Sequence, residues 1–226
     1  MNYVISLGGS LIVPDKIDFN YIHKFAKFIK NLAKNNKVVV VCGGGAVARK
    51  YIHTLMKQRV SKMLLSLAGI ESTRLNATLI SGMLKDSDPI PKSLSEVKTA
   101  LRKKNIVITG ALGSRPNMTT DGNAAEIAGS IKAKYFINLT DVDGLYDKNP
   151  KKSNDAEMIS FINFSEFNKI VSKIKFKAGQ HFVLDQSASK IIQRKKITTV
   201  IINGKNIKNI NNLLLGKSFV GTLISK

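Results

Sequence analysis

The sequence alternates short runs of apolar, β-branched residues with longer segments whose apolar residues recur at helical spacing. Strands and helices that alternate along a chain pack as a mainly parallel sheet covered by helices, so this pattern restricts the chain to an α/β fold. The runs that predict strands are residues 3–7, 37–41, 106–109, 136–139 and 198–202. The spacing predicts helices over residues 22–33, 47–57, 71–84, 124–132, 165–173, 187–194 and 207–215, with Asp18 as the cap of the first.

The segments that lack both patterns are short. The two most loop-like stretches are residues 85–92, with Pro89 and Pro91, and residues 147–155, around Pro150. Neither resembles a flexible linker between domains. We therefore expect a single domain over residues 1–226, with a first half up to about residue 132 and a second half from about residue 133.

Composition excludes several classes of protein. The chain has 226 residues, of which 43% are hydrophobic and 23% charged, which is outside the range of disordered or fibrous sequences. The 36 basic residues against 15 acidic ones give a net charge of +21, which attracts anions such as nucleotides, nucleic acid or acidic lipids. Because the lysines are scattered along the sequence, we expect most of them to lie on a solvated surface.

The single cysteine and the N-terminal segment bear on the cellular setting. Cys42 is the single cysteine, so it forms no intrachain disulfide. Because it stands at the end of an apolar run, we expect it to be a small buried thiol in a reducing compartment. The N-terminal segment lacks the basic leader of a signal peptide, and no apolar run reaches the roughly 20 residues of a membrane-spanning helix. These features predict a cytoplasmic protein with no membrane partner.

Two glycine clusters follow predicted strands: Gly-Gly-Ser at residues 8–10 and Gly-Gly-Gly at residues 43–45. Ligands bind at the carboxyl ends of parallel strands, and glycine lets backbone N–H groups approach phosphate oxygens. The second cluster also opens a predicted helix whose N-terminus favours an anion, and Arg49 lies about one turn along that helix. The clusters indicate either two phosphate sites or two tight turns without a ligand.

Two more polar clusters follow strands, whereas familiar nucleotide fingerprints are absent. No G-x-G-x-x-G follows a strand, and no G-x-x-x-x-G-K-[ST] occurs. Residues 113–121 place hydroxyls, Arg115 and Asp121 ahead of a helix, which suits phosphate or base recognition, although Asp121 also fits an ordinary helix cap. Residues 140–150 place acids, an aromatic and a turn after a strand, and they also fit a simple turn.

Together these motifs resemble the amino acid kinase superfamily. The resemblance rests on residues 8–10, residues 43–45 with Arg49, residues 119–121, residues 142–146 and residues 221–222, and it runs essentially end to end. Within the superfamily, the chain is most similar to the archaeal type of UMP kinases. The resemblance implies a three-layer αβα sandwich with a mainly parallel central sheet, in which the N-terminal half holds the acceptor and the C-terminal half holds ATP.

The resemblance also implies an activity and an assembly. The reaction would transfer a phosphoryl group from ATP to UMP in pyrimidine nucleotide biosynthesis. Phosphoryl transfer depends on alignment and fixed positive dipoles rather than on a strong base, with Mg²⁺ held largely by the ATP phosphates and water. We therefore expect no dedicated metal ligands from the protein. The implied assembly is a homo-oligomer, a hexamer built as a trimer of dimers.

The resemblance assigns each site residue by its position. Catalytic roles fall on Gly9, Arg49, Asp121 and Asp185. ATP would contact Gly9, Ser10, Gly45, Arg49, Thr140, Tyr146 and Asn149. UMP would contact Gly44, Ser66, Ser114, Arg115, Pro116, Asn117, Met118, Thr119 and Thr120.

Three positions depart from the family pattern. Ser6 stands where bacterial members carry a lysine, and Asn149 stands where an aspartate is common in the ATP site. Ser66 stands where UMP kinases usually place an aspartate against the acceptor ribose. The exchange of that charge for a hydroxyl would weaken UMP binding by roughly 1–3 kcal/mol.

These departures keep two alternatives open. One is another small-molecule kinase of the same fold, which would act on a phosphate, carboxylate or carbamate acceptor. The other is a catalytically silent protein that binds nucleotides or nucleic acid. Binding of nucleic acid would need a contiguous basic stripe with stacking aromatics, whereas the chain has no Trp and 7% aromatic residues, so nucleic acid is not expected as a partner.

Overall fold

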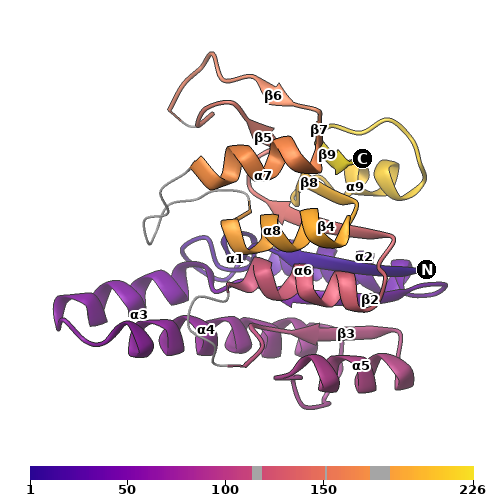
Figure 1. Ribbon diagram of the computed structural model, residues 1–226. Coiled ribbons are helices and arrows are strands. Elements are labelled where there is room, and N and C mark those ends of the chain that lie inside the picture. Colours follow the sequence, from indigo (N-terminus) through magenta and orange to yellow (C-terminus); the bar gives the residue numbers. More distant parts are fainter. Residues whose placement is uncertain (114–118, 151, 174–183) are drawn as a thin grey trace.

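A seven-stranded sheet in the order β3-β2-β1-β4-β8-β9-β7 forms the centre of the computed structural model, which describes residues 1–113, 119–150, 152–173 and 184–226 (Figure 1). Its strands are β1 (Asn2–Leu7), β2 (Lys37–Cys42), β3 (Ile106–Thr109), β4 (Tyr135–Thr140), β7 (Phe161–Asn163), β8 (Thr199–Asn203) and β9 (Thr222–Ser225). The strands β3, β2, β1, β4 and β8 are mutually parallel, and β9 pairs antiparallel with β8. A separate two-stranded sheet joins β5 (Leu145–Tyr146) to β6 (Met158–Ile159).

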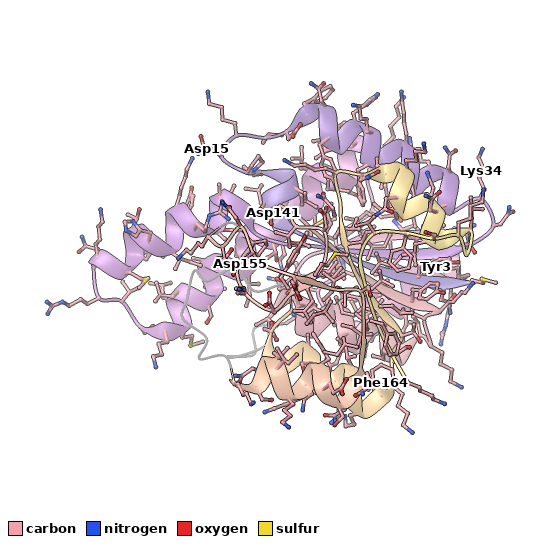
Figure 2. All side chains as sticks on the ribbon, turned by 90° about the horizontal axis from the view of Figure 1, so that it is seen from above. Tyr3, Asp15, Lys34, Asp141, Asp155 and Phe164 are labelled. Atoms are coloured by element: carbon pink, nitrogen blue, oxygen red, sulfur yellow. The ribbon has the colours of Figure 1, made fainter. Side chains whose placement is uncertain are left out.

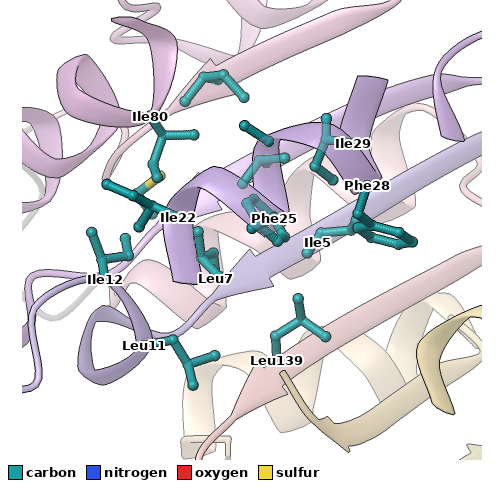
Figure 3. Close-up of a cluster of buried hydrophobic side chains, with 14 of the residues drawn as sticks. Ile5, Leu7, Leu11, Ile12, Ile22, Phe25, Phe28, Ile29, Ile80 and Leu139 are labelled. Atoms are coloured by element: carbon teal, nitrogen blue, oxygen red, sulfur yellow. The ribbon is translucent and has the colours of Figure 1, made fainter. Parts of the chain in front are cut away.

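Helices cover both faces of the sheet. They are α1 (Gly9–Ile12), α2 (Phe19–Leu32), α3 (Gly45–Lys57), α4 (Lys62–Met83), α5 (Leu94–Lys103), α6 (Thr120–Ser130), α7 (Phe164–Lys173), α8 (Gln186–Lys195) and α9 (Ile207–Leu214). Successive side chains of a strand point to opposite faces, so Val40 belongs to a buried cluster that includes residues of α2, α4 and α9. Val39 belongs to a second cluster that includes residues of α5, α6, α7 and α8. Figure 3 shows part of the first cluster, to which α2, α4 and β4 contribute Phe25, Ile80 and Leu139. The predicted three-layer αβα sandwich is confirmed.

The predicted elements agree closely with the structure, with one clear difference. All five predicted strands are present, and Asp18 caps α2, since its Oδ1 accepts a hydrogen bond from Tyr21 N at 3.0 Å. The helix predicted over residues 71–84 begins earlier, at Lys62, where Ser61 provides the cap. The first turns of α4 project beyond the sheet beside α3 (Figure 1), so exposed residues such as Met63 gave no periodic signal of a buried face.

Other elements were not predicted because they bury few side chains or are very short. The helix α5 buries Val97 and Leu101 and is otherwise polar or half-exposed. The strands β5 and β6 have two residues each, and β7 and β9 lie at the far edge of the sheet. Burial of Cys42 is confirmed, and that burial raises the pKa of its thiol.

The strand order places a crevice at the carboxyl end of β1. β1 lies between β2 and β4, so the chain winds away from β1 in both directions, and ligands of open α/β sheets bind at such a reversal. Gly8 N donates to Leu139 O at 3.0 Å, and Gly43 N donates to Leu7 O at 2.9 Å. These bonds hold the ends of β4, β1 and β2 together. The two glycine clusters therefore leave the sheet side by side.

Candidate active site

The turns at residues 8–10 and 43–45 touch through their backbones. A Cβ atom at Gly9 would lie 2.0 Å from the backbone N of Gly45, and one at Gly43 would lie 2.6 Å from the backbone N of Gly9. Gly45 also has a φ of +59°, which disfavours any residue with a side chain. The two turns can approach this closely because glycine lacks a side chain. Both predicted phosphate-binding turns therefore face one shared centre.

The helix α3 starts at this centre. Its first residue is Gly45, and its N-cap Gly44 provides no capping side chain. Ala46 N donates to Val13 O at 2.9 Å, so an anion at this helix start would bind through the neighbouring amides and the helix dipole. Arg49 is exposed on the next turn, where its Nη2 donates to Pro14 O at 2.9 Å. Beside it, Lys50 pairs with Asp15 at 3.0 Å. Arg49 thus lies at the rim of the centre and holds the loop between α1 and α2.

The helix α4 supports the second glycine turn. Asn76 is buried, and its Nδ2 donates to Gly43 O at 2.7 Å. A Cβ atom at Gly44 would lie in ordinary van der Waals contact with α4, 3.5 Å from Ser72 Cβ and 3.7 Å from Gly69 O. Ser66 is exposed one helical turn before Gly69 and therefore lies on the same side of α4. Asn76 was not predicted as a site residue; the available signal is a polar amide between Leu75 and Ala77 in a predicted helix.

The same helix holds the end of β3, where the predicted UMP segment begins. Ala111 N donates to Thr73 Oγ1 at 2.8 Å, and Arg74 Nη2 donates to Gly113 O at 3.1 Å. The predicted contacts Ser114, Arg115, Pro116, Asn117 and Met118 lie outside the described residues. Thr119 is the N-cap of α6, and its Oγ1 accepts from Gly122 N at 3.0 Å; Thr120 is the first residue of that helix. The alternative interpretation of Asp121 as the helix cap is therefore wrong.

Asp121 instead faces Ser6 and the second predicted acid. Ser6 Oγ donates to Asp121 Oδ1 at 2.9 Å. Asp185 is buried and caps α8, since its Oδ1 accepts from Ala188 N at 2.9 Å. Burial, and secondly the charge of Asp185, raise the pKa of Asp121 to about 7, although the Ser6 hydrogen bond acts to lower it. The two acids and Ser6 therefore belong to one polar cluster at the carboxyl end of β1.

Sequence analysis noted Ser6 as a missing lysine but missed its bond to Asp121. A signal was present, because Ser6 is a buried polar residue in the otherwise apolar run of β1. A buried hydroxyl needs a hydrogen-bond partner, and the partner comes from a residue far along the chain.

The predicted ATP residues gather on the other side of β4. Gly204 N donates to Thr140 O at 2.9 Å, which joins the ends of β4 and β8. Leu145 N donates to Thr222 Oγ1 at 2.7 Å, so the structure brings together the motifs at residues 142–146 and 221–222. Tyr146 lies on β5, where partial burial and then the charge of Asp143 raise its pKa.

Asn149 lies in the loop that follows β5. It is exposed, and its carbonyl accepts from Lys152 N at 3.0 Å. Figure 2 shows Asp141 and Asp155 from this region on the same side of the molecule as Asp15. The predicted ATP residues and the glycine turns thus share one edge of the sheet.

The acids of this edge do not form an all-protein metal cage. Among the residues that the structure describes, no group of three or more His, Cys, Asp or Glu side chains could hold a metal ion. Asp121 and Asp185 each have a protein hydrogen-bond partner. Along the same described ranges, no helix is long and apolar enough to cross a membrane.

Comparisons with known proteins agree with this geometry. The model of the amino acid kinase family matches residues 1–203, so the chain belongs to that family. Its relatives within the family are uridylate kinases. The uridylate kinase of Archaeoglobus fulgidus is 38% identical over 100% of both chains, and that of Methanoregula boonei is 37% identical over 94% of this chain and 90% of its own.

Solved structures of uridylate and UMP kinases have the same fold as this chain. The crystal structure of the Archaeoglobus fulgidus uridylate kinase matches 100% of both chains with a TM-score of 0.87 and 36% identity. The UMP kinase of Ureaplasma parvum matches 100% of this chain and 99% of its own with a TM-score of 0.80; at 24% identity it shows the shared fold. The resemblance to archaeal UMP kinases that the sequence motifs indicated is therefore confirmed.

Proposed function

We propose that this chain is a UMP kinase, which transfers the terminal phosphoryl group of ATP to UMP and releases ADP and UDP. The observation that carries the proposal is the backbone contact between the turns at residues 8–10 and 43–45. A donor held by one turn and an acceptor held by the other would place the phosphoryl group and the attacking oxygen next to each other. The full-length similarity to uridylate kinases supports UMP as the acceptor.

The catalytic power would come from alignment and from fixed dipoles. In phosphoryl transfer the negative charge spreads over the equatorial phosphate oxygens. The amides of the two glycine turns, the N-terminus of α3 and Arg49 are the positive groups at this centre. The attacking oxygen of UMP already belongs to a phosphate, so no strong base is required.

Mg²⁺ fits this donor set as an ion held mainly by the ATP phosphates and water. Asp121 and Asp185 supply too few carboxylates for an all-protein site, and both already accept hydrogen bonds. Mg²⁺ usually keeps several waters and binds through one or two carboxylates together with substrate phosphates. When bound with ATP, it would neutralise phosphate charge. Asp121 and Asp185 would orient the water around it.

The proposed substrate contacts follow the halves of the chain. The acceptor would lie against Gly44, Ser66 and the segment up to Thr120, whereas ATP would lie against Thr140, Tyr146 and Asn149. This division assigns the acceptor to residues 1–132 and ATP to residues 133–226. As a UMP kinase, the enzyme would act in pyrimidine nucleotide biosynthesis. The buried free thiol of Cys42 supports a reducing compartment, the cytoplasm.

A kinetic assay with several acceptors tests the proposal. ADP release coupled to NADH oxidation is measured with UMP, CMP, AMP, GMP and a small carboxylate. We expect kcat/KM for UMP to exceed that for every other acceptor at least tenfold. If CMP, AMP or the carboxylate serves as well as UMP, the chain is another small-molecule kinase of the same fold. If no ADP is released with any acceptor, the protein is a catalytically silent homologue.

Ser66 provides a sharper version of the same test. Replacement Ser66→Asp restores the charge that relatives place against the acceptor ribose and should lower KM for UMP about 5- to 100-fold. Ser66→Ala is the matched control and should leave KM within about threefold. An unchanged KM in Ser66→Asp would contradict a ribose contact at this position.

We also propose a homo-oligomer, with a hexamer as a trimer of dimers. The support is an apolar surface on the hairpin of α3 and α4, which projects from the body of the molecule (Figure 1). Its exposed apolar side chains are Tyr51, Met56, Met63, Leu64, Leu67 and Leu75. Apolar groups that gather on one projecting element are typical of a protein contact surface.

A further inference from the structure

The amino ends of the parallel strands form a second edge of the sheet, opposite the candidate active site. Backbone hydrogen bonds join neighbouring strand starts, since Lys37 N donates to Met1 O and Lys134 N donates to Asn2 O, both at 2.8 Å. The starts of β3, β2, β1, β4 and β8 follow the strand order. Neighbouring strands lie about 4.8 Å apart, so these five starts form a row about 19 Å long.

Exposed lysines gather along this row, and we call them the basic edge: Lys34, Lys103, Lys132, Lys134, Lys195 and Lys196. They precede β2, β3, β4 and β8. Figure 2 shows Lys34 on the side of the molecule opposite Asp15, Asp141 and Asp155. Lysines that are scattered along the sequence are therefore collected by the fold, which the sequence analysis did not foresee.

Two carboxylates near the basic edge share one lysine outside it. Asp86 and Asp88 both bind Lys104, at 2.5 Å and 2.9 Å. Among the residues that the structure describes, none of the six lysines of the basic edge forms a salt bridge, although Lys103, after Lys104, helps to lower the pKa of Asp88. Lys134 lies over the ring of Tyr135, 5.4 Å from its centroid. The positive charge of this edge is thus directed to solvent.

The ends of helices account for part of this charge. α5 and α8 end at this edge, and a cation in the last turn stabilises the partial negative charge of a helix C-terminus. Lys103 and Lys195 occupy such last turns. Lys34 and Lys132 directly follow the C-caps of α2 and α6, whereas Lys134 lies farther along the chain and is not explained by a helix dipole. Their mutual repulsion is relieved when a polyanion binds.

We propose that the basic edge binds the phosphate backbone of double-stranded nucleic acid without sequence preference. Backbone binding needs cations at intervals that match phosphates, and it releases counterions from the duplex. Proteins that prefer single strands add exposed aromatic rings on which bases stack. Here Tyr3 is buried, and Tyr135 is half-buried beside Lys134. A duplex therefore fits this edge better than a single strand.

Fluorescence anisotropy of labelled 24-bp RNA and DNA duplexes tests the proposal with the full chain. Affinities are measured between 50 and 200 mM KCl for the unmodified chain and for Lys34→Gln/Lys134→Gln/Lys195→Gln. We expect this variant to bind at least about tenfold more weakly at 50 mM KCl. The slope of log K against log salt should fall by about 3, since each phosphate contact contributes about 0.9.

A variant with the same net charge provides the control. Lys62, Lys169 and Lys208 are exposed on α4, α7 and α9, away from the basic edge, and their triple replacement by Gln should change affinity less than twofold. The kinase activity of both triple variants should equal that of the unmodified chain, because neither removes a residue of the proposed site. If the edge variant unfolds, the single Lys134→Gln variant should still lower affinity more than Lys62→Gln.

Several outcomes would overturn the proposal. One is equal loss of affinity in the edge and control variants, which would show a general effect of net charge. A second is tighter binding to a 24-nucleotide single strand than to the duplex. A third is absence of duplex binding at 50 mM KCl, including the case in which vesicles with acidic lipid bind instead. None of these outcomes bears on phosphoryl transfer, so failure here is distinguishable from failure of the proposed function.

Discussion

At the scale of single residues, Gly9 is the position at which an added methyl group should lower kcat the most. In Gly9→Ala the new Cβ would lie 2.0 Å from Gly45 N, so the two turns must separate. A displacement of about 1 Å costs phosphoryl transfer roughly 100-fold in rate, and we expect at least that loss in kcat. Gly82→Ala is the control, because no atom lies within 4 Å of its Cβ. Equal activity in both variants would refute a shared centre at these turns.

Asp121 should make stability depend on pH. The unfolded carboxyl group, with a pKa near 3.8, loses its proton well before the folded one, with a pKa of about 7. Between these values the folded state holds a proton that the unfolded state has lost, so stability falls as pH rises from about 4 to 7 and then levels off. Asp121→Asn removes this loss and should raise the free energy of unfolding by about 2–4 kcal/mol at pH 8.

Urea unfolding of Asp121→Asn at pH 4.5 and pH 8 measures the effect. The gain in stability should be small at the lower pH and large at the higher one. Asp15→Asn is the control, since the Asp15 carboxylate is an exposed partner of Lys50, and it should show no such increase with pH. A constant difference at both pH values would mean that Asp121 titrates normally.

At the scale of elements, α4 links the parts of the proposed acceptor site. In Asn76→Ala the carbonyl of Gly43 loses a buried partner, which should cost about 1–3 kcal/mol of stability and lower kcat/KM for UMP about tenfold. Thr78→Ala, on the exposed side of the same helix, should change stability by less than about 0.5 kcal/mol. The two variants are compared by urea unfolding and by steady-state kinetics. A loss in kcat/KM that Thr78→Ala matches would contradict this role of Asn76.

Elements could be predicted where one side of a segment is buried. The strand β2 and the helix α2 could be recognised in the sequence from their apolar residues, because burial selects apolar residues at a fixed spacing. The start of α4 and the two-residue strands β5 and β6 have no such face. That the two glycine turns lie at one edge of the sheet could be predicted from their position after strands. The bond between Ser6 and Asp121 could not, because it joins residues 115 positions apart in the chain.

At the scale of the whole molecule, the fold separates charge in a way that sequence order conceals. Parallel strands send every carboxyl end to one edge and every amino end to the other. The first edge collects the glycine turns with Asp121 and Asp185, whereas the second collects the basic edge. Positions in the chain alone could not predict this division, because it follows from strand direction and strand order.

The hairpin of α3 and α4 supplies the remaining prediction, which concerns assembly. If copies of the chain meet through its apolar side chains, Met56→Glu/Met63→Glu should bury repelling charges at the contact and lower the oligomeric mass. Light scattering after size exclusion should give six times 24.8 kDa for the unmodified chain and a smaller multiple for the variant. Leu215→Glu, which changes an exposed apolar residue outside the hairpin, should keep the full mass. A mass of 24.8 kDa for the unmodified chain would exclude the assembly, and an unchanged mass in the double variant would assign the contact to another surface.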